Sequence, residues 1–244
     1  MIIAILSDIH GNMFALSQVM ADLKRFHPDG IILLGDLIDY GMQSNEVVDY
    51  LQSDFPYDVI CNIWGNHERA ILTGDYSGFS SERGEKCARY TASVLTEKTK
   101  NYLDFKLNHE GKDEFILDGR RCLAIHGSLE NPFWDSVFPD NPGGDYRNFD
   151  LVFCGHSHES FFFTKYYDAD NPKMRNKKIT FFINPGSVGQ PRNHNPNAQY
   201  MILDTISLNI SYRSVPYSIE KAMALYDNKE AVDSFYRERL LTGV

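Results

Sequence analysis

The first 66 residues alternate between short apolar runs and segments of helical periodicity. Continuous apolar runs fill residues 2–7 and 31–34, as in strands that are buried on both faces, and residues 58–63 form a third predicted strand. Between them, residues 12–26 and 44–53 place apolar side chains at the spacing of one helical face. This strand–helix–strand–helix–strand order predicts an α/β protein built on a parallel sheet with right-handed crossovers.

The rest of the chain has two different characters. Residues 68–112 hold few strand signals, and a helix is predicted at about 87–107, so this segment is interpreted as an inserted helical cap. Residues 218–240 are also predicted to be helical and amphipathic. Short strands, several of them antiparallel, are predicted at 114–117, 121–125, 151–154, 161–167, 179–183, 200–203 and 206–212. They predict a second sheet packed on the first, within one domain that spans residues 1–244.

Charge and composition restrict the partners of the chain. The formal net charge is −9 and no basic stripe is present, which argues against nucleic-acid binding but allows a small anionic substrate, because bound cations can invert the local field. No apolar stretch approaches the ~20 residues of a membrane span, and no cleavage site follows the first apolar run, so no membrane association and a cytoplasmic location are expected. The four cysteines form no C-x-x-C pair and are expected to be reduced and buried.

Polar residues with metal-binding side chains follow five of the predicted strands. They are Asp8 and His10, then Asp36, then Asn66 and His67, then His126, and finally His156 and His158. Ligands gather at the carboxyl ends of strands in open α/β sheets, so these five tips can meet in one crevice. In an extended segment, residues two apart project to one side, which would apply to Asp8 with His10 and to His156 with His158.

Taken singly, each of these residues has an ordinary structural explanation. Asp36 could cap a helix or a turn, Asn66 could belong to a turn, and His126 could be a hydrogen-bonded core histidine. The distribution of histidines favours a common site, because five of the eight fall at predicted strand ends. The other three (His27, His109 and His194) lie at helix ends or in a polar loop, where solvated side chains are usual.

In five motifs the chain resembles the calcineurin-like metallophosphoesterases. These motifs, in the order and spacing of that family, are Asp8-Ile9-His10, Gly35-Asp36, Gly65-Asn66-His67-Glu68, His126-Gly127 and Gly155-His156-Ser157-His158. The resemblance spans about residues 2–204 and implies a four-layer α-β-β-α sandwich of two mixed sheets flanked by helices, with the helical insertion. Residues 184–192 look like a segment of small bacterial and archaeal members, some of which hydrolyse diadenosine polyphosphates or other phosphodiesters. Ser157 stands where many members have threonine, and no motif covers residues 68–112.

The resemblance implies two divalent metal ions as cofactors. One would be held by Asp8, His10, Asp36 and His158, and the other by Asp36, Asn66, His126 and His156. Two carboxylates, four imidazoles and an amide oxygen suit Mn²⁺, or alternatively Fe, Ni²⁺ or Zn²⁺, better than Ca²⁺ or Mg²⁺. In this family's mechanism a hydroxide held between the two metals attacks the phosphorus atom in line.

Several further residues are assigned roles near this centre. By the resemblance, His67 is the catalytic residue that stabilises the transition state or protonates the leaving oxygen; the alternative is a hydrogen bond that only orients the loop. Arg192 and Ser187 are candidates for substrate binding, although a solvated arginine is an equal alternative. Asp39 would orient a ligand histidine or cap a turn. The aromatic residues of 131–138, such as Trp134, would stack on a nucleobase or pack as core or lid.

The sequence therefore predicts a hydrolase that cleaves a phosphodiester or phosphoanhydride of a small nucleotide-like substrate. Three alternatives remain open: a phosphomonoesterase, a nuclease, which the acidic charge disfavours, and a non-catalytic scaffold, for which the retromer subunit of this fold is a precedent. A homo-oligomer is compatible with the sequence.

Overall fold

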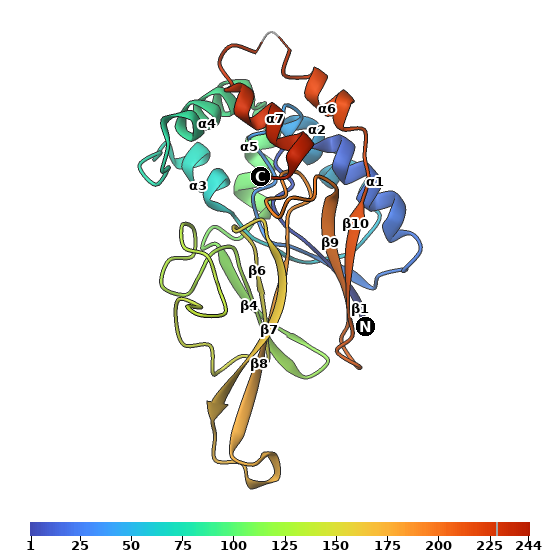
Figure 1. Ribbon diagram of the computed structural model, residues 1–244, viewed down its shortest axis with the longest axis vertical. Coiled ribbons are helices and arrows are strands. Elements are labelled where there is room, and N and C mark those ends of the chain that lie inside the picture. Colours follow the sequence, from blue (N-terminus) through green and yellow to red (C-terminus); the bar gives the residue numbers. More distant parts are fainter. Residues whose placement is uncertain (228) are drawn as a thin grey trace.

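Two mixed five-stranded sheets form the framework of the computed structural model, which describes residues 1–227 and 229–244 (Figure 1). The first sheet has the order β10 (Ile210–Val215), β9 (Ala198–Asp204), β1 (Ile2–Leu6), β2 (Gly30–Leu33) and β3 (Val59–Asn62). The second has the order β4 (Lys112–Leu117), β5 (Arg120–Ile125), β6 (Leu151–Cys154), β8 (Lys177–Pro185) and β7 (Ser160–Asp168). Strands β1, β2 and β3 are parallel, as predicted, and so are β5, β6 and β8.

Strand β1 contributes to two apolar layers because its side chains alternate between the faces of the sheet. Ile3 and Ile5 belong to the core between the two sheets, together with Phe153 of β6. Ala4 and Leu6 pack on the other face under the helices α1 (Met13–Leu23) and α2 (Ser44–Ser53). These four strand residues are fully buried, which explains why the sequence shows a continuous apolar run. The predicted sandwich of two mixed sheets with flanking helices is confirmed.

The segment after β3 is helical, as predicted, but its helices have different bounds. It holds α3 (Asn66–Thr73), α4 (Glu82–Val94) and α5 (Glu97–Lys106), so a single helix at 87–107 is wrong. Leu95 adopts an extended backbone, and the hydroxyl of Thr96 accepts a hydrogen bond from the N–H of Thr99 at the start of α5. A threonine in this position begins a new helix because its side chain satisfies a free N–H of the first turn.

Two further predictions near the C-terminus had the wrong bounds. The predicted helix at 218–240 is two helices, α6 (Ile219–Ala224) and α7 (Ser234–Thr242), and Asn228 lies outside the described residues. The last strand begins at Ile210 rather than at Ile206, because the carboxylate of Asp204 accepts hydrogen bonds from the N–H of Ile206 and the hydroxyl of Ser207. This local bonding makes a turn instead of a strand.

The outer face of the second sheet is covered by the segment between β5 and β6. No helix occurs in this segment, whose buried residues Val137, Tyr146 and Phe149 pack on Leu123 and Phe182 of the sheet. Beyond this core the hairpin of β7 and β8 projects from the body of the molecule (Figure 1). All four cysteines are buried and unpaired, as predicted. In the described part of the chain, no helix is long and apolar enough to cross a membrane.

Candidate metal centre

The loops that follow β1 and β2 are held together by main-chain hydrogen bonds past the ends of the strands. The N–H of Asp8 donates to the carbonyl of Gly35 (3.1 Å), and that of His10 donates to the carbonyl of Asp36 (2.9 Å). The second sheet joins them, because the N–H of His156, after β6, donates to Oδ2 of Asp8 (3.2 Å). The polar tips of both sheets therefore meet at one edge of the sandwich.

The backbone at these tips is left-handed rather than extended. Asp8, His10, Asp36, His156 and His158 have φ values of 53°, 46°, 52°, 64° and 59°. The prediction that Asp8 with His10, and His156 with His158, project from extended segments is therefore wrong. The side chains converge because the backbone turns at these left-handed residues. For residues other than glycine such a conformation costs about 1–3 kcal/mol each, and it is usually found where a binding site requires it.

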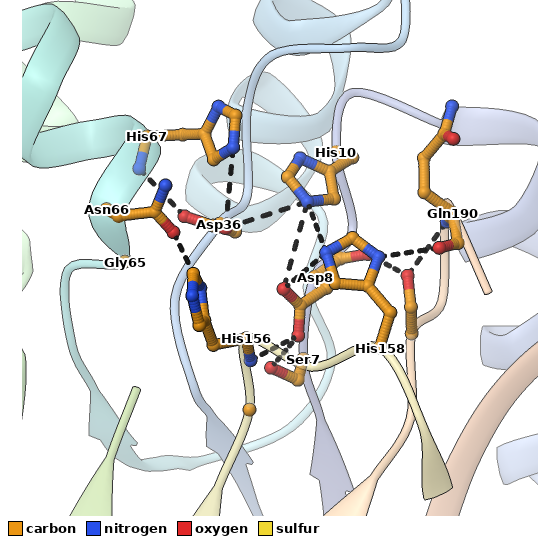
Figure 2. Close-up of polar contacts among 12 residues, drawn as sticks. Ser7, Asp8, His10, Asp36, Gly65, Asn66, His67, His156, His158 and Gln190 are labelled. Carbon is orange, nitrogen blue, oxygen red and sulfur yellow. Dashed lines mark hydrogen bonds and ion pairs between the residues drawn. The ribbon is translucent and has the colours of Figure 1, made fainter. Parts of the chain in front are cut away.

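Two groups of buried side chains converge at this edge, and Asp36 belongs to both. The first group is Asp8, His10, Asp36 and His158, and the second is Asp36, His126 and His156. Within each group, the candidate ligand atoms lie within 4.8 Å of one another. Oδ1 of Asn66 lies 3.0 Å from Nδ1 of His156 (Figure 2). The same oxygen lies 3.1 Å from Nε2 of His126. The structure thus brings together all seven residues named as ligands, whereas His27, His109 and His194 are exposed elsewhere.

Each of the two aspartates has one oxygen fixed by hydrogen bonds and one oxygen without a partner. Oδ2 of Asp8 accepts from the hydroxyl of Ser7, and Oδ1 of Asp36 accepts from the N–H of His67 (3.0 Å). Oδ1 of Asp8 and Oδ2 of Asp36 are buried and accept no hydrogen bond. The first lies 3.1 Å from Nε2 of His158, and the second lies 3.3 Å from Nε2 of His126. A buried carboxylate oxygen without a donor is costly, which fits an oxygen that ligates a cation.

Three of the histidines are oriented by main-chain carbonyls. The Nδ1 atoms of His10, His126 and His158 lie 3.1, 2.7 and 2.6 Å from the carbonyl oxygens of Ile38, Leu34 and Gln190, respectively. A carbonyl oxygen can only accept, so Nδ1 carries the proton and Nε2 keeps a free lone pair, as in ligand histidines. Nε2 of His10 and Nε2 of His158 lie only 3.2 Å apart, and a cation bound by both would stabilise this pair of facing lone pairs.

The charges at this centre require a compensating positive charge. Burial lowers the pKa of His10 and His158, and burial together with the charge of His126 lowers that of His156 to about 3, so these rings are neutral and able to ligate. Burial alone would also lower the pKa of His126, but the carboxylate of Asp36 outweighs it and raises the value to about 9. A divalent cation bound here would provide the positive charge that the carboxylate of Asp36 favours, so the buried aspartates and histidines fit divalent metal binding.

His67 points to the other side of Asp36. Its Nδ1 lies 2.6 Å from Oδ2 of Asp39, whose Oδ1 accepts from the hydroxyl of Thr91 in α4. The prediction that Asp39 orients a ligand histidine is therefore wrong, because Asp39 orients His67. Burial lowers the pKa of His67, but the negative charges of Asp36 and Asp39 outweigh burial and raise it above its usual value. These two carboxylates therefore favour the protonated form of the ring.

A pocket of about 200 Å³ opens over both clusters. Its lining residues are Asp36, Tyr40, Asn66, His67, Gly78, Phe79, Ser80, Trp134, His156, His158 and Arg192. Arg192 is thus placed where the sequence predicts substrate binding, but Ser187 is not. The fully buried hydroxyl of Ser187 donates to the carbonyl of Asp8 (2.7 Å) and accepts from the N–H of Gln190 (2.8 Å), so it fixes the backbone of the centre. A larger cavity of about 500 Å³ lies along β3 and α5 and includes no residue of either cluster.

Glu68 has a role that the sequence analysis did not assign. Its buried carboxylate accepts from the N–H groups of Gly65, Asp36 and Leu37 (2.8 Å each) and Ile38 (3.2 Å), so it fixes the loops that carry Asp36 and Asn66. Burial, followed by the charge of Asp36, raises its pKa to about 7. A glutamate three residues after the N-cap residue, here Gly65, is one half of the capping-box pattern, because its carboxylate accepts from the N–H of the N-cap. This spacing was the available signal.

Replacing Glu68 by alanine is expected to destabilise the protein strongly. Four N–H groups would lose their acceptor, and each buried donor left unpaired costs about 1–3 kcal/mol, so the free energy of unfolding should fall by at least about 3 kcal/mol. For a chain of this size the melting temperature should drop by about 6–12 °C, measured by circular dichroism. The control is Glu85→Ala, which breaks an exposed ion pair with Arg89 and should cost under about 1 kcal/mol. Equal losses in the two variants would contradict the role of Glu68.

Comparison with known proteins identifies the family to which the chain belongs. The sequence profile of the calcineurin-like phosphoesterase superfamily domain matches residues 1–207, and the chain belongs to this superfamily. An uncharacterized protein of Methanocaldococcus jannaschii is 31% identical over 252 residues, which cover 99% of this chain and 98% of that protein. The crystal structure of a metallophosphoesterase from Sphaerobacter thermophilus has a TM-score of 0.74 at 25% identity and covers 100% of this chain and 99% of its own. A hypothetical protein from Pyrococcus horikoshii OT3 shares the fold, with a TM-score of 0.76 at 18% identity over 100% of this chain and 98% of its own.

Proposed function

We propose that this protein is a dinuclear metal-dependent phosphoesterase that hydrolyses a phosphodiester or phosphoanhydride bond of a small nucleotide-like substrate. The observation that carries the proposal is the pair of ligand clusters that share Asp36 and open into one pocket. One metal ion would be held by Asp8, His10, Asp36 and His158, and the other by Asp36, Asn66, His126 and His156. The donor set favours Mn²⁺ over Ca²⁺ or Mg²⁺.

The residues of the centre divide the work of binding and proton transfer. When bound, two divalent cations supply an activated water nucleophile and neutralise the oxygens of the phosphate under attack. Asp8 and Asp36 bring only two negative charges, so the loaded centre stays positive and attracts an anion although the chain has a net charge of −9. Arg192 lines the same pocket, and its planar guanidinium can bind two phosphate oxygens at once.

His67 is the candidate proton donor. Asp39 fixes its Nδ1, and Nε2 lies 3.9 Å from Oδ2 of Asp36, at the wall of the pocket rather than among the ligand atoms. A protonated ring in this position can donate to the oxygen that leaves the phosphorus atom. The hydrogen bond from the hydroxyl of Thr91 to Asp39 supports the same orientation from α4.

The proposed activity is tested on a panel of substrates with the manganese-loaded protein. The panel contains p-nitrophenyl phosphate, bis-p-nitrophenyl phosphate, cyclic nucleotides and diadenosine tetraphosphate. We expect metal-dependent turnover of the diester or of the anhydride, and no turnover after chelation. Faster turnover of the monoester would contradict the proposal and indicate a phosphomonoesterase. Failure of every substrate, with two manganese ions bound, would favour a protein without catalytic activity.

Replacing Trp134 by alanine tests whether the substrate is a nucleotide. The indole lines the pocket and packs edge to face on Phe79, with ring centroids 5.2 Å apart, so it can either stack on a base or serve as a lid. If it stacks on a base, the KM for nucleotide substrates should rise about tenfold, because base stacking on an aromatic ring contributes about 1–3 kcal/mol. The KM for p-nitrophenyl phosphate should stay unchanged, and equal changes for both substrates would leave Trp134 as a lid residue.

A further inference from the structure

Three arginines from separate segments gather beside the pocket. Arg83 lies in the first turn of α4, Arg192 follows β8, and Arg239 lies in α7. The guanidinium carbons of Arg83 and Arg239 lie 3.9 and 4.4 Å from the centroid of the Phe235 ring, so both cations share one aromatic side chain. Arg192 lines the pocket over the metal clusters.

Helix α7 connects this group of arginines to the pocket. Tyr236, the neighbour of Phe235, stacks on Tyr40 with ring centroids 4.5 Å apart, and Tyr40 lines the pocket. The side-chain amide of Gln190 donates to the carbonyl of Tyr236 (3.4 Å), which ties α7 to the loop that leads to Arg192. Figure 1 shows α7 beside α4 above the sheets. Helix α7 lies outside the part of the chain that matches the superfamily domain, so it adds residues to a common centre.

The positive charges of these arginines are not balanced by acidic side chains. In the described residues, none of the three forms an ion pair with an aspartate or glutamate side chain. The two glutamates near Arg83 are engaged elsewhere, since Glu82 pairs with Lys86 and Glu85 pairs with Arg89. Three arginines that lie together without a side-chain carboxylate as partner make this surface locally positive, although the chain as a whole is acidic.

Two details indicate that this surface suits an anion. Nε of Arg192 is buried and has no hydrogen-bond acceptor, whereas Nε of Arg239 already has one in an oxygen atom of Val244, the last residue of the sequence (2.6 Å). Burial, followed by the positive charges of Arg192 and Arg83, lowers the pKa of Arg239 to about 10. Like charges that crowd in this way repel one another, and an anion bound between them relieves the repulsion.

We infer that Arg83, Arg192 and Arg239 bind a second phosphate group of the substrate, so that the substrate class is a phosphoanhydride chain such as a nucleoside or dinucleoside polyphosphate. The inference rests on the proposed function for the position of the first phosphate, over the metal clusters. The pocket of about 200 Å³ is smaller than the roughly 300–1,000 Å³ of sites that enclose a drug-sized ligand. A pocket of this size can hold the phosphate under attack, and the following phosphates would extend towards α4 and α7.

The double variant Arg83→Gln with Arg239→Gln tests the inference in the manganese-loaded protein. We expect its KM for diadenosine tetraphosphate to rise at least about tenfold relative to its KM for bis-p-nitrophenyl phosphate, which has a single phosphate, because a hydrogen bond to a charged group contributes about 1.5–3 kcal/mol. Calorimetric titration adds a readout without turnover. Loss of the two arginines should lower the affinity for β,γ-methylene-ATP at least about tenfold more than the affinity for AMP.

Arg237→Gln is the matched control, because it removes the same charge from the same helix at a side chain that faces Asp227 instead. Arg237→Gln should change neither the ratio of the two KM values nor the ratio of the two nucleotide affinities. The double variant Arg83→Lys with Arg239→Lys should retain part of the affinity that the glutamine variant loses. Unchanged ratios in a folded double glutamine variant would overturn the inference and leave the proposed function intact. If the wild-type protein turns over no substrate, the proposed function fails, and the titration with β,γ-methylene-ATP and AMP still decides the second phosphate site.

Discussion

His67→Ala is expected to keep both metal ions bound and to slow turnover by about 10²–10⁴ on a substrate with a poor leaving group, because general acid catalysis contributes about that factor. The side chain of His67 is fixed by Asp39 at the wall of the pocket and belongs to neither ligand cluster. Its loss should therefore remove a proton donor and leave the metal content unchanged. Steady-state kinetics and elemental analysis of the same preparation measure the two quantities.

The leaving group provides the control for this prediction. The oxygen of p-nitrophenol leaves with little help from an acid, so the loss of rate for His67→Ala should be smaller on p-nitrophenyl esters than on an alkyl or nucleoside ester. The same loss on both substrates would instead indicate that His67 only holds the loop. A loss that disappears when manganese is added would show that the substitution weakens metal binding.

Asp36→Asn is expected to have the larger effect, because Asp36 contributes to both clusters. The change replaces an anionic candidate ligand by a neutral amide and removes the negative charge that lies between the two proposed metal positions. Bound manganese should fall below one ion per chain, and turnover should decrease by about 10³-fold or more, since a catalytic metal ion stabilises the transition state by several kcal/mol.

Asp39→Asn is the matched comparison for Asp36→Asn. The two substitutions are chemically identical and three positions apart, but Asp39 contacts His67 and Thr91 rather than the ligand clusters. Asp39→Asn should therefore keep its manganese and lose activity through the orientation of His67. Full metal content in Asp36→Asn, or equal metal loss in both variants, would refute the shared ligand.

The sequence predicts the location of the centre because this depends on a simple geometric rule. Parallel strands place their carboxyl ends at one edge, so Asp8 after β1 and Asp36 after β2 had to lie near each other once both strands were recognised. The apolar run before Asp8 also predicts burial on two faces, since local periodicity and burial agree there.

Other features depend on contacts between distant segments and leave little local trace. The left-handed backbone of His156 and His158 accompanies hydrogen bonds to the distant residues Asp8 and Gln190, and no residue type at these positions predicts it. Asp39 contacts His67 rather than a ligand histidine, and residue spacing does not predict this contact, because it gives no side-chain direction in a loop with a left-handed backbone. Arg239 lies far along the chain from every motif, so only the packing of α7 on Tyr40 brings it near the centre.

Each ligand cluster takes side chains from loops of both sheets. In one, Asp8 and His10 follow β1 while His158 follows β6; in the other, Asp36 follows β2 while His126 follows β5. A cation bound in either cluster joins the two halves of the sandwich, and any affinity for the folded arrangement adds directly to its stability. The concentration of the metal ion would then govern the stability of the folded protein as well as its rate of turnover. Without the metal ion the protein would be inactive, and it would also unfold and be degraded more readily.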